Sequence, residues 1–295
     1  MENVHTKSRK TKMTLALSKE TEPSTLATLA EDDDELIRQA VAANPSTPGV
    51  ALSKLAQDRL VRIRSWVSAN PSTPTDDLDR LAVDYYGEYR YQVAANPSTP
   101  VGTLTMLAED GYVEVRAGVG GNKNTPIKTL LKLTNDIDFH VRSAVGANPC
   151  ATEELLYQLA LDKSSLVRLS VAENKNAGEN TLDFLSNDMD STVRLRVAGN
   201  HNTKSEVLLR MYYDAIENDD IEEKWIEEAL KNGLLLPETE LNAIVATYGL
   251  PVAEIIAESV PVIKGGTLYK QLVKCKCIPR VFAVQSPTKG CEIHE

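Results

Sequence analysis

The sequence has few cysteines, which stabilise many secreted domains, and few histidines, which many active sites use, and it is also poor in phenylalanine. Its 295 residues include four cysteines, four histidines and three phenylalanines. Three of the cysteines stand near the C-terminus, so the disulfide framework of a small secreted domain is not expected. Because histidines are few and neither a nucleophile elbow nor a phosphate-binding loop is present, we expect no enzymatic activity.

Long hydrophobic runs and an excess of basic residues are also missing. The apolar run around Met13 to Leu17 is too short for the core of a signal peptide, and no segment has the length of a membrane span. The net charge of −10 argues against a nucleic-acid binder, because attraction to phosphates needs a basic face. We therefore expect a cytoplasmic protein that has no membrane partner.

What the sequence does contain is a strict repeat of 26 residues. Asn44 opens the segment Asn-Pro-Ser-Thr-Pro, which recurs identically at Asn70 and Asn96 and in altered form further along the chain. The asparagines that mark the repeat are Asn44, Asn70, Asn96, Asn122, Asn148, Asn174 and Asn200. A fixed period of this size is typical of a solenoid, in which each unit packs only on its neighbours.

Two short helices are predicted within each repeat. Thr47 is expected to cap the first helix, with Pro48 at its first position and Leu52 among its core residues. The second helix should contain Ile63 and end at Asn70, which can adopt the left-handed conformation that ends many helices. Both segments are short enough that one of the two could be a 3-10 helix.

Arginine and aspartate also recur with the period, and each arginine lies six residues after an aspartate. The arginines are Arg38, Arg64, Arg90, Arg116, Arg142, Arg168 and Arg194. Arginine donates two hydrogen bonds to one carboxylate, so stacked repeats could join these columns into a ladder of ion pairs. The alternative is an arginine stripe that grips phosphate, which the accompanying aspartates disfavour. The asparagine column is likewise interpreted as a structural ladder.

Two stretches carry a family resemblance. They are Val193 to Asn200, and Asn96 to Pro100 followed by Leu104, Leu107-Ala108 and Asp110. Together they resemble the leucine-rich repeat variant family over about residues 18–213, with packing logic similar to that of HEAT repeats. The resemblance implies an all-α fold, a right-handed superhelical solenoid that alternates short α- and 3-10 helices. It implies little about activity. The iron–sulfur segment that precedes the repeats in some members cannot be carried over, because no cysteine precedes Cys150.

The composition divides the chain into four regions. Residues 1–17 are expected to be a basic, disordered tail, and residues 18–213 the solenoid. Residues 214–263 are interpreted as degenerate helical pairs that form a C-terminal cap. Residues 264–295 form a basic tail that contains three cysteines.

Aromatic residues gather in two neighbouring repeats and mark the candidate partner-binding site. The five residues are Trp66, Tyr85, Tyr86, Tyr89 and Tyr91. Trp66 occupies a position where other repeats have alanine, glycine, serine, glutamine or arginine, so we expect it to face outward. Clustered tyrosine and tryptophan are favoured at protein interfaces. Local packing is the alternative interpretation.

The C-terminal tail contains the one candidate metal site, formed by Cys275, Cys277, Cys291 and His294. Four such ligands suit tetrahedral zinc, and an iron–sulfur cluster is a further option. The spacing matches no defined zinc finger, so free thiols clustered by chance remain the alternative, and no cofactor is expected.

From these observations we expect a non-catalytic repeat scaffold that binds another protein. The second hypothesis is a regulatory protein that depends on a metal or an iron–sulfur cluster at the C-terminal cysteines. A helical solenoid that binds nucleic acid ranks third, because of the acidic charge.

Overall fold

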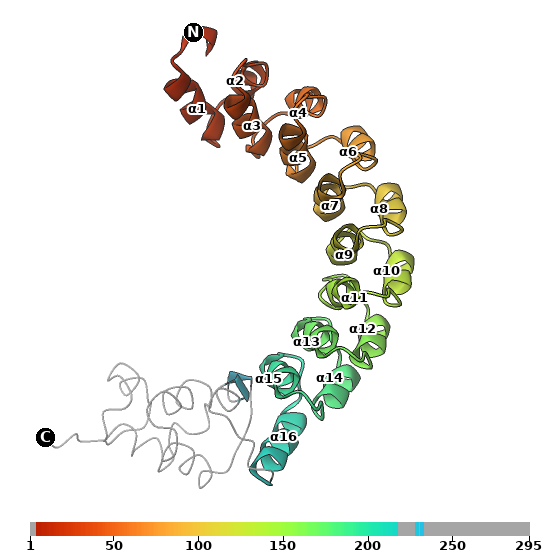
Figure 1. Cartoon of the computed structure of the whole chain (residues 1–295). Helices are drawn as coiled ribbons and strands as arrows, with labels where there is room; N and C mark the ends of the chain where they lie inside the picture. The colour runs from red at the N-terminus through yellow and green to blue at the C-terminus, as the bar shows by residue number, and fades with distance from the viewer. Residues whose placement is uncertain (1–3, 218–227, 230, 233–295) are drawn as a thin grey trace, which may run out of the picture. The chain divides into compact units, whose positions relative to one another are not determined.

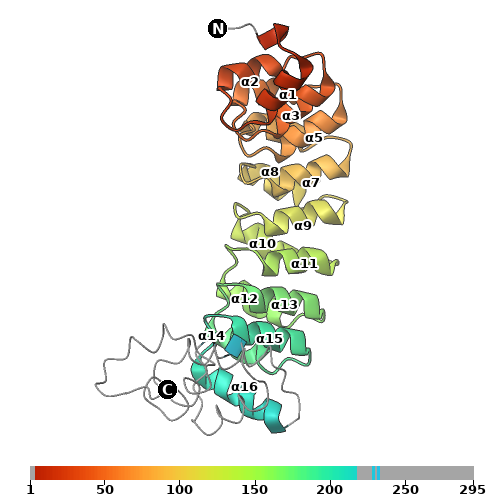
Figure 2. The same cartoon turned by 90° about the vertical axis from the view of Figure 1, so that its left-hand side faces the viewer.

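The computed structural model describes residues 4–217, 228–229 and 231–232, which contain sixteen α-helices and no β-strand. The chain divides into two compact units, residues 1–171 (unit 1) and residues 172–295 (unit 2), and α13 crosses their boundary. Within unit 1 the odd-numbered helices form one layer and the even-numbered helices a second layer (Figure 1), and successive pairs are stacked on one another (Figure 2).

The odd-numbered helices are α1 (Arg9–Leu17), α3 (Glu35–Ala43), α5 (Val61–Ala69), α7 (Gly87–Ala95), α9 (Val113–Gly121), α11 (Phe139–Gly146), α13 (Ser165–Glu173) and α15 (Ser191–Gly199). The even-numbered helices are α2 (Pro23–Leu29), α4 (Gly49–Leu55), α6 (Thr75–Leu81), α8 (Val101–Leu107), α10 (Ile127–Leu133), α12 (Glu153–Ala160), α14 (Glu179–Leu185) and α16 (Ser205–Glu217). The prediction of an all-helical repeat solenoid is therefore confirmed.

Both helices of each repeat are α-helices, although they are short. In one repeat α4 has seven residues and α5 has nine, lengths at which an isolated helix is not stable in water. Their stability comes from packing, since Leu52, Leu55 and Ile63 are almost completely buried. The alternation of α- and 3-10 helices that the resemblance implied is not found in the described residues, where the one 3-10 helix is Val4–Thr6.

The helix ends differ in two details from what the sequence suggested. Pro48, and not Thr47, caps α4, because the Pro48 carbonyl accepts the first backbone bonds of that helix. The Thr47 hydroxyl instead donates to the Val41 carbonyl at 2.6 Å, which ties the loop to the preceding helix. Asn70 does not adopt the left-handed conformation at the end of α5 and has extended backbone angles, φ −75° and ψ 123°.

The asparagine column forms a buried ladder between repeats, as predicted. Asn70 Nδ2 donates to the carbonyls of Ala42 at 2.7 Å and Asn44 at 2.9 Å, both in the preceding repeat. Its Oδ1 accepts from the Ser72 backbone N–H at 2.9 Å. The same pair of bonds to carbonyls 28 and 26 residues earlier is made by Asn44, Asn96, Asn122, Asn148 and Asn200. Each asparagine therefore satisfies helix-end carbonyls that would otherwise be buried without a donor.

The arginine and aspartate columns form a second ladder in unit 1. Arg116 donates from Nε and Nη2 to both oxygens of Asp136 in the next repeat, at 2.6 and 3.0 Å. Its Nη1 donates to the backbone carbonyl of Asp110, six residues earlier, at 2.8 Å. Equivalent ion pairs join Arg38 to Asp58, Arg64 to Asp84, Arg90 to Asp110, and Arg142 to Asp162. These guanidinium groups hold neighbouring repeats together, so the structural interpretation of the column is confirmed.

The ladder changes the acidity of its aspartates. Burial by itself would raise the pKa of Asp136, but hydrogen bonds from Arg116 and from the Asp138 backbone N–H outweigh burial, so its pKa lies below the usual value. The pKa values of three other ladder carboxyls are lowered by the same balance: Asp58, Asp110 and Asp162. Their charged form is therefore stabilised in the folded chain.

These lowered pKa values predict acid sensitivity. A carboxyl whose folded pKa lies below its unfolded value of about 3.9 contributes stability above that value and loses it as the pH falls through the folded pKa. We expect the free energy of unfolding to be nearly constant from about pH 7 to about pH 5 and to fall steeply below about pH 4. Urea denaturation at a series of pH values measures this. The Asp136→Asn variant should show a shallower decline, and a chain whose stability increased below pH 4 would contradict the prediction.

A column of small residues sets the distance between the odd-numbered helices. The residue two positions before each ladder asparagine of unit 1 is alanine, serine or glycine: Ala42, Ser68, Ala94, Gly120 and Gly146. A Cβ atom on Gly120 would lie 3.2 Å from the Ala144 Cβ and 3.2 Å from the Val141 carbonyl oxygen of α11. Large side chains in this column would force adjacent helices apart.

The expectation of a disordered N-terminal tail over residues 1–17 is wrong for the part that the structure describes. Residues 9–17 form α1, which occupies the place of an odd-numbered helix before the first complete repeat (Figure 1). Ala16 is fully buried, and its carbonyl accepts from Asn44 Nδ2 at 2.8 Å. Lys12 and Asp32 form an ion pair of 2.8 Å at the positions that arginine and aspartate occupy in later repeats.

In unit 2 the period is interrupted after Asn200. Helix α16 has thirteen residues, whereas α14 has seven. Asn232 then donates to the carbonyls of Ala198 and Asn200, as the ladder asparagines do. It lies 32 residues after Asn200, so the repeat has lengthened by six residues, which is also the difference in length between the two helices. Apart from 228–229 and 231–232, the residues of the predicted cap after α16 lie outside the described residues, as do all of 264–295.

Candidate functional site

Three tyrosines of the candidate site meet where α7 begins. Tyr86 is the N-cap residue of α7, and Tyr85 directly precedes it. The rings of Tyr85 and Tyr86 are in edge-on contact, with centroids 5.3 Å apart, and those of Tyr86 and Tyr89 are 5.5 Å apart. Tyr85 is 87% exposed and Tyr86 50% exposed, so this edge of the repeat presents a broad aromatic surface to solvent.

Tyr89 differs from its neighbours because it stands in a core column of the repeat. The equivalent residues of other repeats in unit 1, Ile37, Ile63, Val115 and Val141, are fully buried or nearly so. Tyr89 is half-buried, and burial, followed by the nearby charges of Glu88 and Asp84, raises the pKa of its hydroxyl. Its ring therefore contributes to packing in the core column and also contacts the ring of Tyr86.

Trp66 and Tyr91 lie on the helices α5 and α7 in adjoining columns of the repeat. Trp66 is 45% exposed, in agreement with the expectation that its variable position in the repeat faces outward, and Tyr91 is also exposed. The Tyr91 ring rests on α9, because a Cβ atom built on Gly118 would lie 3.2 Å from Tyr91 Cδ2 and 3.0 Å from the Ala94 Cβ. Glycine at this position thus makes room for the tyrosine ring on the neighbouring helix.

The structure adds Tyr112 to the site, a residue that the sequence reasoning did not single out. Tyr112 caps α9 at the position that Tyr86 has in α7, 26 residues earlier. A Cβ atom on Gly87 would lie only 2.8 Å from two atoms of the Tyr112 ring, so the ring lies directly on α7. The signal was present in the sequence as two tyrosines one period apart, with a glycine after the first. We call Trp66, Tyr85, Tyr86, Tyr91 and Tyr112 together the aromatic surface.

The predicted metal ligands Cys275, Cys277, Cys291 and His294 lie outside the described residues. Among the residues that the structure describes, no group of three or more histidine, cysteine, aspartate or glutamate side chains is placed to hold a metal ion. The C-terminal set stays a prediction, which metal analysis of the purified chain would test.

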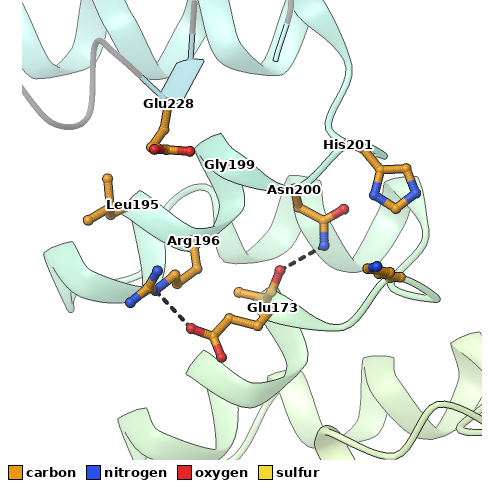
Figure 3. A pocket seen from close by; sticks show the side chains of 9 residues that line it. Glu173, Leu195, Arg196, Gly199, Asn200, His201 and Glu228 are labelled. Carbon is orange, nitrogen blue, oxygen red and sulfur yellow. Dashed lines mark hydrogen bonds and ion pairs between the residues drawn. The ribbon is translucent and has the colours of Figure 1, made fainter. Parts of the chain in front are cut away.

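Unit 2 contains a pocket of about 340 Å³ between the end of α13, the face of α15 and Glu228 (Figure 3). Arg196 and Glu173 form an ion pair of 2.9 Å at its wall, and His201 lies at its other side. Asn200, which also lines the pocket, is held by the Ala172 carbonyl. The charged side chains here are of both signs, so the pocket favours no single class of ligand.

No helix in the part of the chain that the structure describes combines the length and the hydropathy needed to cross a bilayer. Within each unit the described helices are short and amphipathic, and their apolar faces form the core between neighbouring repeats. These features define the class as a helical repeat solenoid.

Comparison with known proteins identifies the family. No family model and no curated protein matches the chain. A solved structure described as a leucine-rich repeat variant with a novel repetitive protein structural motif is 30% identical in sequence to this chain. The match covers 61% of this chain and 72% of the solved chain, with a TM-score of 0.43. The 26-residue pattern and this sequence identity show that the chain belongs to the leucine-rich repeat variant family. A solved structure of an engineered protein is 17% identical in sequence, and the match covers 94% of this chain and 93% of the engineered chain, with a TM-score of 0.38.

Proposed function

We propose that this chain is a non-catalytic repeat scaffold that binds another protein through the aromatic surface. The observation that supports the proposal is the concentration of exposed rings in the repeats of α5, α7 and α9. The repeat itself does not require them, because Leu78, Leu81 and Val93 already fill the core of the repeat that contains α7. Exposed, largely rigid aromatic side chains lose little entropy on binding and are common anchors of interfaces.

The asparagine ladder and the arginine–aspartate ladder also support this proposal. The repeated arginines, aspartates and asparagines are engaged in contacts between repeats, so they provide rigidity and not a ligand site. A rigid stack keeps the exposed rings in fixed positions, which lowers the entropic cost of binding. A cytoplasmic location is part of this proposal, since four cysteines in 295 residues suit a reducing compartment.

Trp66→Ala and Tyr85→Ala should each weaken partner binding about tenfold or more, with little change in melting temperature. Affinity capture with the intact chain, followed by titration of the captured protein, measures this. Ile137→Ala is the matched control, because Ile137 occupies the position of Tyr85 two repeats later and is 93% exposed. Tyr89→Ala should lower the melting temperature, because it removes a ring from the core column. Intact binding in the Trp66 and Tyr85 variants would refute the proposed site.

A further inference from the structure

We propose that the aromatic surface recognises a protein segment that carries exposed arginine or lysine side chains, an inference that rests on the proposed function. Two tyrosines one repeat apart, Tyr86 and Tyr112, are each followed two residues later by a glutamate, Glu88 and Glu114. Ring faces and carboxylates thus alternate along one edge of the stack, where α7 and α9 begin. Both groups attract cations, the ring through its quadrupole and the carboxylate through its charge.

Glu88 and Glu114 differ from three other exposed glutamates of unit 1. Glu31, Glu35 and Glu109 each form an ion pair with a lysine or arginine of the adjacent repeat. Glu88 and Glu114 are exposed and form no ion pair with any residue that the structure describes. Their negative charge is therefore available to a partner.

The charges around the surface favour a cationic partner over an anionic one. Arg64 and Arg90 lie close by, but their guanidinium groups are held by Asp84 and Asp110 of the ladder. Arg59 and Arg62 stand one repeat before Tyr85 and Glu88, and Arg62 is held in an ion pair with Glu35. The two glutamates lie within the surface, and the chain as a whole has a net charge of −10. Electrostatic complementarity with a basic segment follows.

Within the chain, the ring of Tyr112 already binds a guanidinium group, that of Arg90. The Arg90 Cζ atom lies 5.2 Å from the centroid of the Tyr112 ring, a cation–π contact. Tyr112 is nevertheless 55% exposed, so much of its ring remains accessible. Tyr85 is more exposed still and stands in edge-on contact with Tyr86. A guanidinium or ammonium group of the partner could approach these rings beside Glu88 or Glu114.

The test uses the purified full chain and three fluorescent peptides that consist of repeated Gly-Arg, Gly-Lys or Gly-Gln. Fluorescence anisotropy at low salt should detect binding of the first two peptides and not of the third, with weaker binding at about 300 mM salt. The double variant Glu88→Gln and Glu114→Gln should weaken binding about tenfold or more. The double variant Tyr86→Leu and Tyr112→Leu should weaken it to a similar degree. Circular dichroism verifies that both variants are folded.

The matched control is the double variant Glu22→Gln and Asp76→Asn, which removes two exposed carboxylates from the even-numbered layer. It should bind the basic peptides within about twofold of the unmodified chain. The inference would be overturned if this control lost as much affinity for the basic peptides as the glutamate variant does, or if the Gly-Gln peptide bound as tightly as the basic peptides. If Trp66→Ala and Tyr85→Ala lose the cellular partner while the glutamate variant retains it, the proposed function stands and the cationic partner is refuted. Retention of the partner by all of these variants would refute both.

Discussion

Replacing Arg116 by alanine should lower the free energy of unfolding by about 3–5 kcal/mol, one of the two largest effects expected for a single substitution. The Arg116 and Asp136 side chains are only 15% and 8% exposed, so the variant leaves a nearly buried carboxylate without its cation. It also removes the donor to the Asp110 carbonyl. Urea denaturation followed by circular dichroism measures the loss. Because long repeat arrays can unfold in parts, hydrogen exchange should show that the loss centres on α9 and α11.

Lys132→Ala provides the control for Arg116→Ala. Lys132 also pairs with a carboxylate of an adjacent repeat, that of Glu109, but both side chains are more than half exposed. An exposed ion pair contributes about 0–1 kcal/mol, so this variant should unfold almost as the unmodified chain does. If Arg116→Ala kept its stability and lost partner binding, the arginine column would be a binding surface and the structural interpretation would be wrong.

Asn96→Ala should have an effect of similar size, a loss of about 3 kcal/mol or more. The Asn96 side chain donates to the carbonyls of Ser68 at 2.7 Å and Asn70 at 2.9 Å, and accepts from the Ser98 N–H at 2.8 Å. Each buried polar group left without its partner costs about 1–3 kcal/mol. Asn96→Asp should be no better tolerated, since a carboxylate cannot donate to the two carbonyls and would bring a buried charge against them. Urea denaturation compares the two variants directly.

The control for Asn96 is Asn124→Ser, in the adjoining loop. Asn124 Nδ2 donates to the Pro97 carbonyl, and in the preceding repeat the Ser98 hydroxyl makes the equivalent bond to Pro71. Serine can therefore replace Asn124 with its bond preserved, and the change in stability should be within about 0.5 kcal/mol. Equal losses in the Asn96 and Asn124 variants would mean that the loop, and not the buried ladder, holds the repeats together.

Part of what the sequence reasoning missed was present in the alignment of repeats. Lys12 and Ala16 stand one period before Arg38 and Ala42, so α1 could have been recognised by extending the alignment towards the N-terminus. Tyr89 similarly aligns with the buried Ile63. Asn232 was harder to find, because the longer α16 shifts it by six residues out of the period.

The sequence by itself determined the period, the two helices of each repeat and the positions that face the core, because these follow from spacing along a helix. It did not determine how the repeats dock. Arg116 could have paired with Asp110 six residues earlier, but it binds the carboxylate of Asp136 in the next repeat and only the backbone of Asp110. The ring of Tyr112 on Gly87 is likewise a contact between repeats. Only the tertiary structure decided these contacts. The register between neighbouring helices depends on how side chains from different repeats pack together, and the spacing of residues along the sequence does not specify that packing.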